Sequence, residues 1–118
     1  KKVIFFENYE LATNLLIKNL NNLNFSKKAE INKKNIYDLN SLKKLNYKFD
    51  IVFLDPPFKD KNLKILLNKI ANSKILNSKS LIIIHRNKKS IDEFHENFKI
   101  ARKEIYGSSK IIFGFFNF

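Results

Sequence analysis

The chain contains no cysteine, and only two glycines and two prolines, in 118 residues. Without cysteine it has no disulfide, no thiol chemistry and no cysteine-based zinc site, which fits a reducing compartment. No apolar run approaches the roughly 20 residues of a membrane helix, and the N-terminus lacks a signal-peptide pattern. The two histidines have no metal-ligand spacing. We therefore expect a cytoplasmic protein with no membrane and no metal partner.

Charge of one sign dominates the chain. Its 23 lysines and arginines outweigh 11 acidic residues, which gives a net charge of +12 and a pI near 9.9. Such a balance favours a polyanionic partner, and nucleic acid is the first candidate. However, every basic residue except Arg86 and Arg102 is lysine, and asparagine is abundant. Two explanations stay open: binding to nucleic acid, and a coding bias toward Lys, Asn and Ile.

Apolar runs alternate with helical patterns along the chain, which is long enough for one domain at most. The predicted strands are 3–6, 29–32, 51–54, 81–84, 99–106 and 111–118. The predicted helices are 9–23, 38–45, 60–72 and one that contains Ile91, Phe94, His95 and Phe98. Apolar strands separated by helices indicate an α/β fold with a mostly parallel sheet covered on both faces. The last two strands, joined by the turn 107–109, predict an antiparallel hairpin.

Three polar residues fall at or after predicted strand ends, where open α/β sheets bind ligands. Glu7 closes the first strand, Asn35 follows the second by a few residues, and Asp55 closes the third. A carboxylate in such a place can bind the two hydroxyls of a ribose, and an asparagine side chain offers adenine one donor and one acceptor. Each also has a plain alternative, since Glu7 suits a helix N-cap and Asn35 an ordinary loop.

Both prolines lie in Asp55-Pro56-Pro57-Phe58, the Asp-Pro-Pro-Phe segment, directly after an apolar strand. An exocyclic amine of a nucleobase is a poor nucleophile because its lone pair is delocalised into the ring. The Asp55 carboxylate and the Pro56 carbonyl could accept its two hydrogens, and the prolines fix the chain direction so that both acceptors converge. Phe58 could stack on the base, which offsets the cost of removing it from a helix. The alternative is a rigid turn in which Asp55 is a cap.

Residues 50–58 resemble the motif (Asp/Asn/Ser)-Pro-Pro-(Tyr/Phe/Trp) of S-adenosylmethionine-dependent amino-methyltransferases. The chain as a whole resembles the bacterial 16S rRNA guanine-N2 methyltransferases, and the further similar stretches are 4–7, 16–20, 31–36 and 106–109. The resemblance implies a Rossmann-like class I methyltransferase sheet and S-adenosyl-L-methionine as cofactor. The implied catalytic residues are Asp55, Pro56, Pro57 and Phe58. The implied cofactor-binding residues are Glu7, Asn8, Asn35, Ile36 and Asp55.

One feature departs from that family. Its members carry a first strand and a Gly-rich loop that holds the methionine part of the cofactor, whereas no glycine here precedes Gly107. We therefore expect a single partial catalytic domain, residues 1–118, that lacks the first strand of the sheet. These residues alone should bind cofactor poorly and turn over little.

The resemblance implies 16S rRNA or the small ribosomal particle as partner, and a monomeric enzyme. The alternatives are another RNA or DNA amino-methyltransferase, such as one acting on adenine N6, and a non-catalytic basic RNA-binding remnant. A protein-glutamine methyltransferase is disfavoured, because that group typically carries asparagine at the place of Asp55. His85 is expected to be a solvated strand-end residue and His95 a packing residue. Lysine pairs such as Lys88-Lys89 could contact phosphate.

Overall fold

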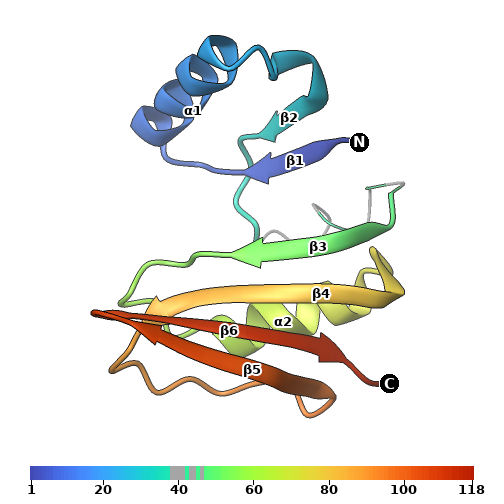
Figure 1. Cartoon of the computed structure of the whole chain (residues 1–118). Coiled ribbons are helices and arrows are strands. Elements are labelled where there is room, and N and C mark those ends of the chain that lie inside the picture. The colour runs from blue at the N-terminus through green and yellow to red at the C-terminus, as the bar shows by residue number, and fades with distance from the viewer. Residues whose placement is uncertain (38–41, 43–44, 46) are drawn as a thin grey trace. The chain divides into compact units, whose positions relative to one another are not determined.

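The computed structural model describes residues 1–37, 42, 45 and 47–118. The chain forms two compact units, Lys1–Ser41 and Leu42–Phe118, and each is considered by itself (Figure 1). The helix predicted at 38–45 lies outside the described residues except for two of its positions. Among the residues that are described, no helix is long and apolar enough to cross a membrane.

The first unit is built on two parallel strands, β1 (Val3–Phe6) and β2 (Ala29–Asn32). They are connected through helix α1 (Glu10–Asn22) and the short 3₁₀ helix η1 (Ser26–Lys28). The first turn of α1 is secured by the Thr13 hydroxyl, which donates to the Tyr9 carbonyl at 3.0 Å. After α1 the chain reverses at Asn24, whose φ of 58° lies in the left-handed region that asparagine tolerates. Both strands and the helix predicted at 9–23 are confirmed.

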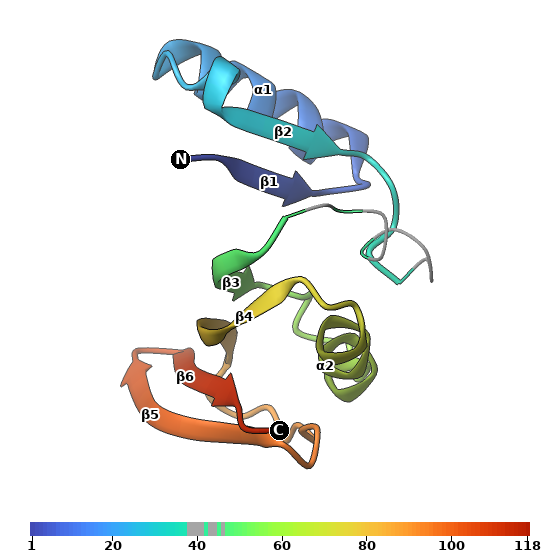
Figure 2. The ribbon, with the colours of Figure 1, turned by 90° about the vertical axis from the view of Figure 1, so that its right-hand side faces the viewer.

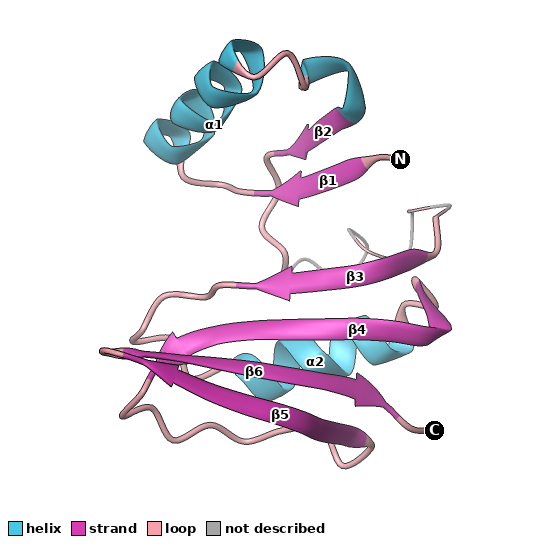
Figure 3. Ribbon diagram, in the orientation of Figure 1, coloured by secondary structure: helices cyan, strands magenta, loops and turns pink. Residues whose placement is uncertain are grey.

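The second unit is a four-stranded sheet in the order β3-β4-β6-β5 (Figure 3). Its strands are β3 (Phe49–Leu54), β4 (Leu76–Asn87), β5 (Phe98–Tyr106) and β6 (Ser109–Phe116). β3 and β4 pair in parallel, as strands joined by a crossover helix do, whereas β6 pairs antiparallel to both β4 and β5. The predicted hairpin is therefore confirmed, and β4 extends well beyond the predicted 81–84.

Helix α2 (Leu63–Asn72) covers one face of this sheet (Figure 2). Its buried side chains recur at helical spacing: Leu63, Leu66, Leu67 and Ile70. Ile82 and Ile84 of β4 and Ile112 of β6 are also fully buried, and their alternation along each strand places them on one sheet face. On the other face of β3, Ile51 and Phe53 are each 60% exposed. Burial of both faces, as the sequence predicted, is therefore not seen for this strand.

The helix predicted around Ile91, Phe94, His95 and Phe98 is wrong. Residues 88–97 form turns and irregular chain, and Phe98 is the first residue of β5. Ile91 is 99% exposed, so its side chain does not belong to the buried face of a helix. The helical spacing is coincidental, because Phe94 stacks on Phe98 at a centroid distance of 5.6 Å while His95 meets Phe116 edge-on. Phe94, His95 and Phe98 therefore pack through ring contacts at the hairpin, and not through burial of a helix face.

The two glycines allow a matched test of hairpin packing. A Cβ on Gly114 would lie 2.3 Å from Cζ of Phe98 and 2.7 Å from the Lys99 carbonyl oxygen, whereas a Cβ on Gly107, at φ +58°, would meet nothing within 4 Å. We expect Gly114→Ala to lower the free energy of unfolding by about 3 kcal/mol, through overpacking against backbone. Gly107→Ala should lower it by about 1 kcal/mol, through backbone strain alone. Urea unfolding of both variants measures the difference, and equal losses would contradict it.

Candidate functional site

The Asp-Pro-Pro-Phe segment leaves β3 at its carboxyl end, directly after the buried residue Leu54. The side chain of Asp55 is 58% exposed, and Phe58 is 57% exposed. A turn follows at once, in which the amide of Asp60 donates to the Pro57 carbonyl at 2.9 Å. The strand thus delivers a carboxylate and an aromatic ring to solvent at the edge of the sheet where α/β proteins bind ligands.

Asp55 does not stand alone at this edge. Its Oδ1 lies 2.9 Å from Nδ1 of His85, and Nε2 of the same ring lies 2.9 Å from the hydroxyl of Ser109. His85 is 34% exposed and lies within β4, two residues before its end, so the expectation of a solvated strand-end histidine is wrong. That expectation missed its partners. The three residues come from β4, β6 and the end of β3, which are neighbours in the sheet.

The hydrogen-bonding capacities of these groups fix their roles. An ionised carboxylate only accepts, so Nδ1 of His85 must carry the hydrogen that it donates to Asp55. In the neutral ring Nε2 is then an acceptor, and the Ser109 hydroxyl donates to it. Within the described part of the chain, Oδ2 of Asp55 has no hydrogen bond. One carboxylate oxygen is therefore held by the protein and the other is open to a ligand.

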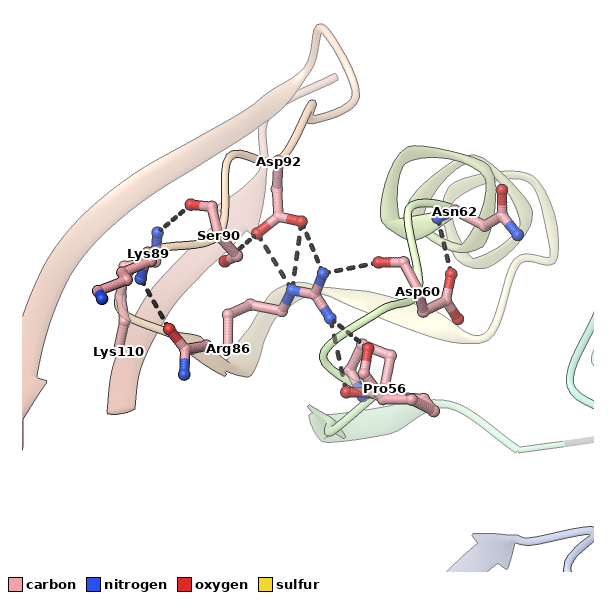
Figure 4. A network of polar contacts seen from close by, with 10 residues as sticks. Pro56, Asp60, Asn62, Arg86, Lys89, Ser90, Asp92 and Lys110 are labelled. Carbon is pink, nitrogen blue, oxygen red and sulfur yellow. Dashed lines mark hydrogen bonds and ion pairs between the residues drawn. The ribbon is translucent and has the colours of Figure 1, made fainter. Parts of the chain in front are cut away.

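A buried guanidinium holds the backbone of the same segment (Figure 4). Nη1 of Arg86 donates to the Pro57 carbonyl at 3.0 Å and reaches the Pro56 carbonyl at 3.5 Å, and Nη2 donates to the Asp60 carbonyl at 2.7 Å. Its charge is balanced by Asp92, which accepts from Nε at 3.2 and 3.1 Å and from Nη2 at 2.9 Å. These two side chains are only 2% and 4% exposed. The turn after β3 is thereby tied to β4 and to the loop that follows it.

The Arg86–Asp92 pair has its own support. The Ser90 hydroxyl donates to Oδ2 of Asp92 at 2.9 Å, and Nζ of Lys110 donates to the Ser90 carbonyl at 2.9 Å. Sequence reasoning gave Arg86 no role, although a signal was present. Arg86 continues the alternation of Ile82 and Ile84 on the buried face of β4, and it is one of two arginines in a lysine-rich chain.

The predicted role of the Pro56 carbonyl meets a constraint here. The sequence suggested that it accepts a hydrogen of the target amine, and in the structure it faces Nη1 of Arg86 at 3.5 Å, the limit of a hydrogen bond. A carbonyl oxygen has two lone pairs, so the weak contact leaves one available. The role of Pro56 stays a prediction.

The predicted cofactor residues lie at the corresponding edge of the first unit. β1 and β2 are parallel with Phe6 opposite Asn32, and the amide of Glu7 extends the pairing by donating to the Asn32 carbonyl at 3.1 Å. Oε1 of Glu7 accepts from the Tyr9 amide at 3.0 Å, which fixes the carboxylate at the strand end. The carboxyl ends of both strands therefore meet where Glu7 was expected to bind.

The remaining predicted cofactor residues follow these two strands. Asn8 is exposed directly after Glu7. Asn35 is exposed and its Oδ1 accepts from the Tyr37 amide at 2.9 Å, so it caps a turn, while Ile36 is half-buried. Glu7, Asn8, Asn35 and Ile36 thus belong to the first unit, and the Asp-Pro-Pro-Phe segment belongs to the second.

Comparison with known proteins shows the family of this chain. Residues 1–115 match the family described as "Conserved hypothetical protein 95". The chain belongs to this family. Over 68 residues it is also 35% identical to the uncharacterized methylase RP545 of Rickettsia prowazekii, a match that covers 57% of this chain and 28% of that protein. The matched region is therefore a minor part of that relative.

Solved structures define the fold of this Conserved hypothetical protein 95 member. HI0767 of Haemophilus influenzae, described provisionally as a methylase, superposes with a TM-score of 0.77 at 29% identity, over 97% of this chain and 71% of that one. The protein yhhF of Escherichia coli, described provisionally as a methyltransferase, gives a TM-score of 0.76 at 22% identity, over 96% of this chain and 61% of that one. The predicted α/β class I methyltransferase fold is confirmed, and the described residues form two parallel and two antiparallel strand pairings.

The buried Arg86–Asp92 pair yields a stability prediction. Arg86→Met removes the partner of a buried carboxylate and three backbone acceptors lose their donor, so we expect the free energy of unfolding to fall by about 3–5 kcal/mol. The double variant Arg86→Met/Asp92→Leu should recover part of that loss, because no unpaired charge remains. Arg102→Met is the matched control, since Arg102 is exposed and its ion pair with Glu104 lies at the surface. Chemical unfolding measures all three, and a loss at Arg102 equal to that at Arg86 would contradict the assignment.

Proposed function

We propose that the protein containing this chain transfers a methyl group from S-adenosyl-L-methionine to an exocyclic amino group of a nucleobase. The observation that carries the proposal is the state of Asp55, which has one oxygen held by His85 and one open to solvent, beside the exposed ring of Phe58. This acceptor and stacking platform follow a strand of a class I methyltransferase fold. The target we propose is guanine N2 in 16S rRNA of the small ribosomal subunit.

Asp55 need not act as a strong base in this reaction. Its open oxygen accepts one hydrogen of the amine, which localises the nitrogen lone pair and orients it toward the methyl donor. The Pro56 carbonyl accepts the second hydrogen. Because the two prolines restrict the backbone, both acceptors are already in place before the base binds. Phe58 stacks on the base, a contact worth about 1–3 kcal/mol. The proton can leave the nitrogen after the methyl group has been transferred.

S-adenosyl-L-methionine would supply an electrophilic methyl group, and the first unit has groups that suit its adenosine part. The Glu7 carboxylate is fixed at the end of β1 by the Tyr9 amide and retains Oε2 for a ribose hydroxyl. Asn8 lies next to it, while Asn35 and Ile36, after β2, would contact the adenine edge and face. These are the places in which α/β sheets bind nucleotides.

The proposed RNA target is supported by charge. The net charge of +12 favours a polyanion, and four exposed lysines flank the Asp-Pro-Pro-Phe segment and the loop after β4: Lys59, Lys61, Lys88 and Lys89. We propose that the protein acts as a cytoplasmic monomer on 16S rRNA or the small ribosomal particle. A second candidate, methylation of adenine N6, is favoured by the same Asp-Pro-Pro-Phe segment, because it accepts any planar amine.

A third candidate is a basic RNA-binding remnant without catalysis. The basic balance of the chain supports this candidate as it supports the two enzymes. Cofactor binding separates it from the two enzymes, and mass mapping of rRNA from cells with and without the protein identifies the methylated nucleotide.

Replacement of Asp55 tests the chemistry. Asp55→Ala should abolish methyl transfer to small-subunit RNA, because no acceptor orients the amine, while the affinity for S-adenosylmethionine stays within a few fold. Radiolabelled methyl incorporation and calorimetric binding measure the two quantities. Asp50→Ala is the matched control on the same strand, where the Asp50 carboxylate accepts from the Asn77 side-chain amide at 2.6 Å. Undiminished transfer by Asp55→Ala would refute the role of Asp55.

Replacement of Glu7 tests the cofactor site. Glu7→Gln keeps an acceptor for the Tyr9 amide but removes the charge, so we expect the affinity for S-adenosylmethionine to fall on the order of tenfold. Glu10→Gln, in the first turn of α1, is the control and should leave the affinity unchanged. Calorimetry with the whole protein measures these affinities. Equal affinities of the wild-type protein and Glu7→Gln would show that Glu7 does not bind the ribose.

A further inference from the structure

We propose that His85 is a positioning residue that holds the Asp55 carboxylate in the orientation its reaction needs, and that Ser109 holds the His85 ring in place for this contact. The inference rests on the proposed function, since it assigns to Asp55 an acceptor that must point at an amine. It adds two residues that sequence reasoning had left without a role. Neither is asked to touch the base or the cofactor.

Strand register places the three residues in a row. β3 and β4 run parallel with Leu54 opposite Ile84, so the next residues, Asp55 just after β3 and His85 within β4, lie side by side. β6 lies on the other side of β4, with Ile111 opposite His85, and Ser109 is two residues from Ile111 on the same face. Each of three adjacent strands therefore contributes one polar side chain at one end of the sheet.

Asp55 needs such a support because little else restrains its side chain. It is more than half exposed, and the two backbone groups that Arg86 holds nearby belong to Pro56 and Pro57, not to Asp55. An exposed carboxylate exchanges its rotamers and its two oxygens freely. The contact of 2.9 Å from Nδ1 of His85 to Oδ1 selects one arrangement, in which Oδ2 is the oxygen left for a ligand.

Asp55 selects the tautomer of His85, and Ser109 holds the ring. A histidine ring can carry its hydrogen on either nitrogen, and only a ring with a hydrogen on Nδ1 donates to the acceptor-only carboxylate of Asp55. The Ser109 hydroxyl, 2.9 Å from Nε2, can then donate to the unprotonated Nε2 and fixes the position of the ring. Because His85 is one-third exposed and has no part in the buried core, its removal should affect orientation far more than stability.

The first test reads the tautomer directly. Long-range ¹H–¹⁵N spectra of the two histidines of the whole protein, assigned with His95→Asn, should show neutral His85 protonated at Nδ1. In Asp55→Ala this preference should weaken, because the acceptor of the Nδ1 hydrogen is lost, whereas in Ser109→Ala it should persist. A neutral His85 protonated at Nε2 would overturn the proposal, and so would a tautomer population that Asp55→Ala leaves unchanged. This measurement does not depend on activity.

The second test separates positioning from structure. His85→Leu should lower kcat for methyl transfer on the order of tenfold with KM for S-adenosylmethionine unchanged, because misorientation acts on the reacting geometry. His85→Asn should restore most of kcat, since its amide nitrogen takes the place of Nδ1 and can still donate to Asp55. His95→Asn, the same substitution at a ring that packs on Phe116, is the control and should behave as wild type.

The outcomes are distinguishable. Wild-type kcat in a folded His85→Leu, or His85→Asn no better than His85→Leu, would overturn the role of His85. If the wild-type protein itself transfers no methyl group to small-subunit RNA, the proposed function fails. The tautomer measurement then still decides whether His85 holds Asp55. If His85→Leu does not fold, the spectra of the wild-type protein and Asp55→Ala decide alone.

Discussion

The buried ion pair between Arg86 and Asp92 is the interaction on which the Asp-Pro-Pro-Phe segment depends. A guanidinium taken out of water must have its charge balanced and its donors used. Asp92 supplies the charge, and the carbonyls of Pro57 and Asp60 accept the principal remaining hydrogens. The same requirement therefore fixes the turn after β3, the end of β4 and the loop that replaces the predicted helix. A site that must present a carboxylate in a defined direction gains a rigid backbone from this constraint.

Two neighbouring residues of β4 contact the Asp-Pro-Pro-Phe segment from opposite faces of the sheet. Arg86 points to the buried face and holds the backbone of the segment, whereas His85 points to the open face and holds the Asp55 side chain. The alternation of a strand makes this division possible, because adjacent residues face opposite ways. The parallel register of β3 and β4 then sets Asp55 beside His85. A shift of one residue would exchange the two faces and separate both contacts.

Much of the architecture was predictable because local pattern and burial agree. The apolar runs 3–6 and 51–54 form β1 and most of β3, and leucine spacing located α1 and α2 within a few residues. The helix expected around Phe94 failed because spacing cannot distinguish helix burial from ring packing onto a hairpin. His85 was expected just after a strand but lies within β4, and its partners are 30 and 24 residues away in sequence, a contact that no local pattern encodes.

The sequence by itself determined the chemistry on offer: an acidic residue and two prolines at a strand end, an aromatic ring beside them, a strongly basic balance and no cysteine. These follow from residue identity and from the short-range geometry of proline, so they need no tertiary information. Only the tertiary structure decided which groups restrain Asp55 and its backbone. That depends on strand order and register, which bring β3, β4 and β6 together, and on burial, which compels Arg86 to find its partners within the protein.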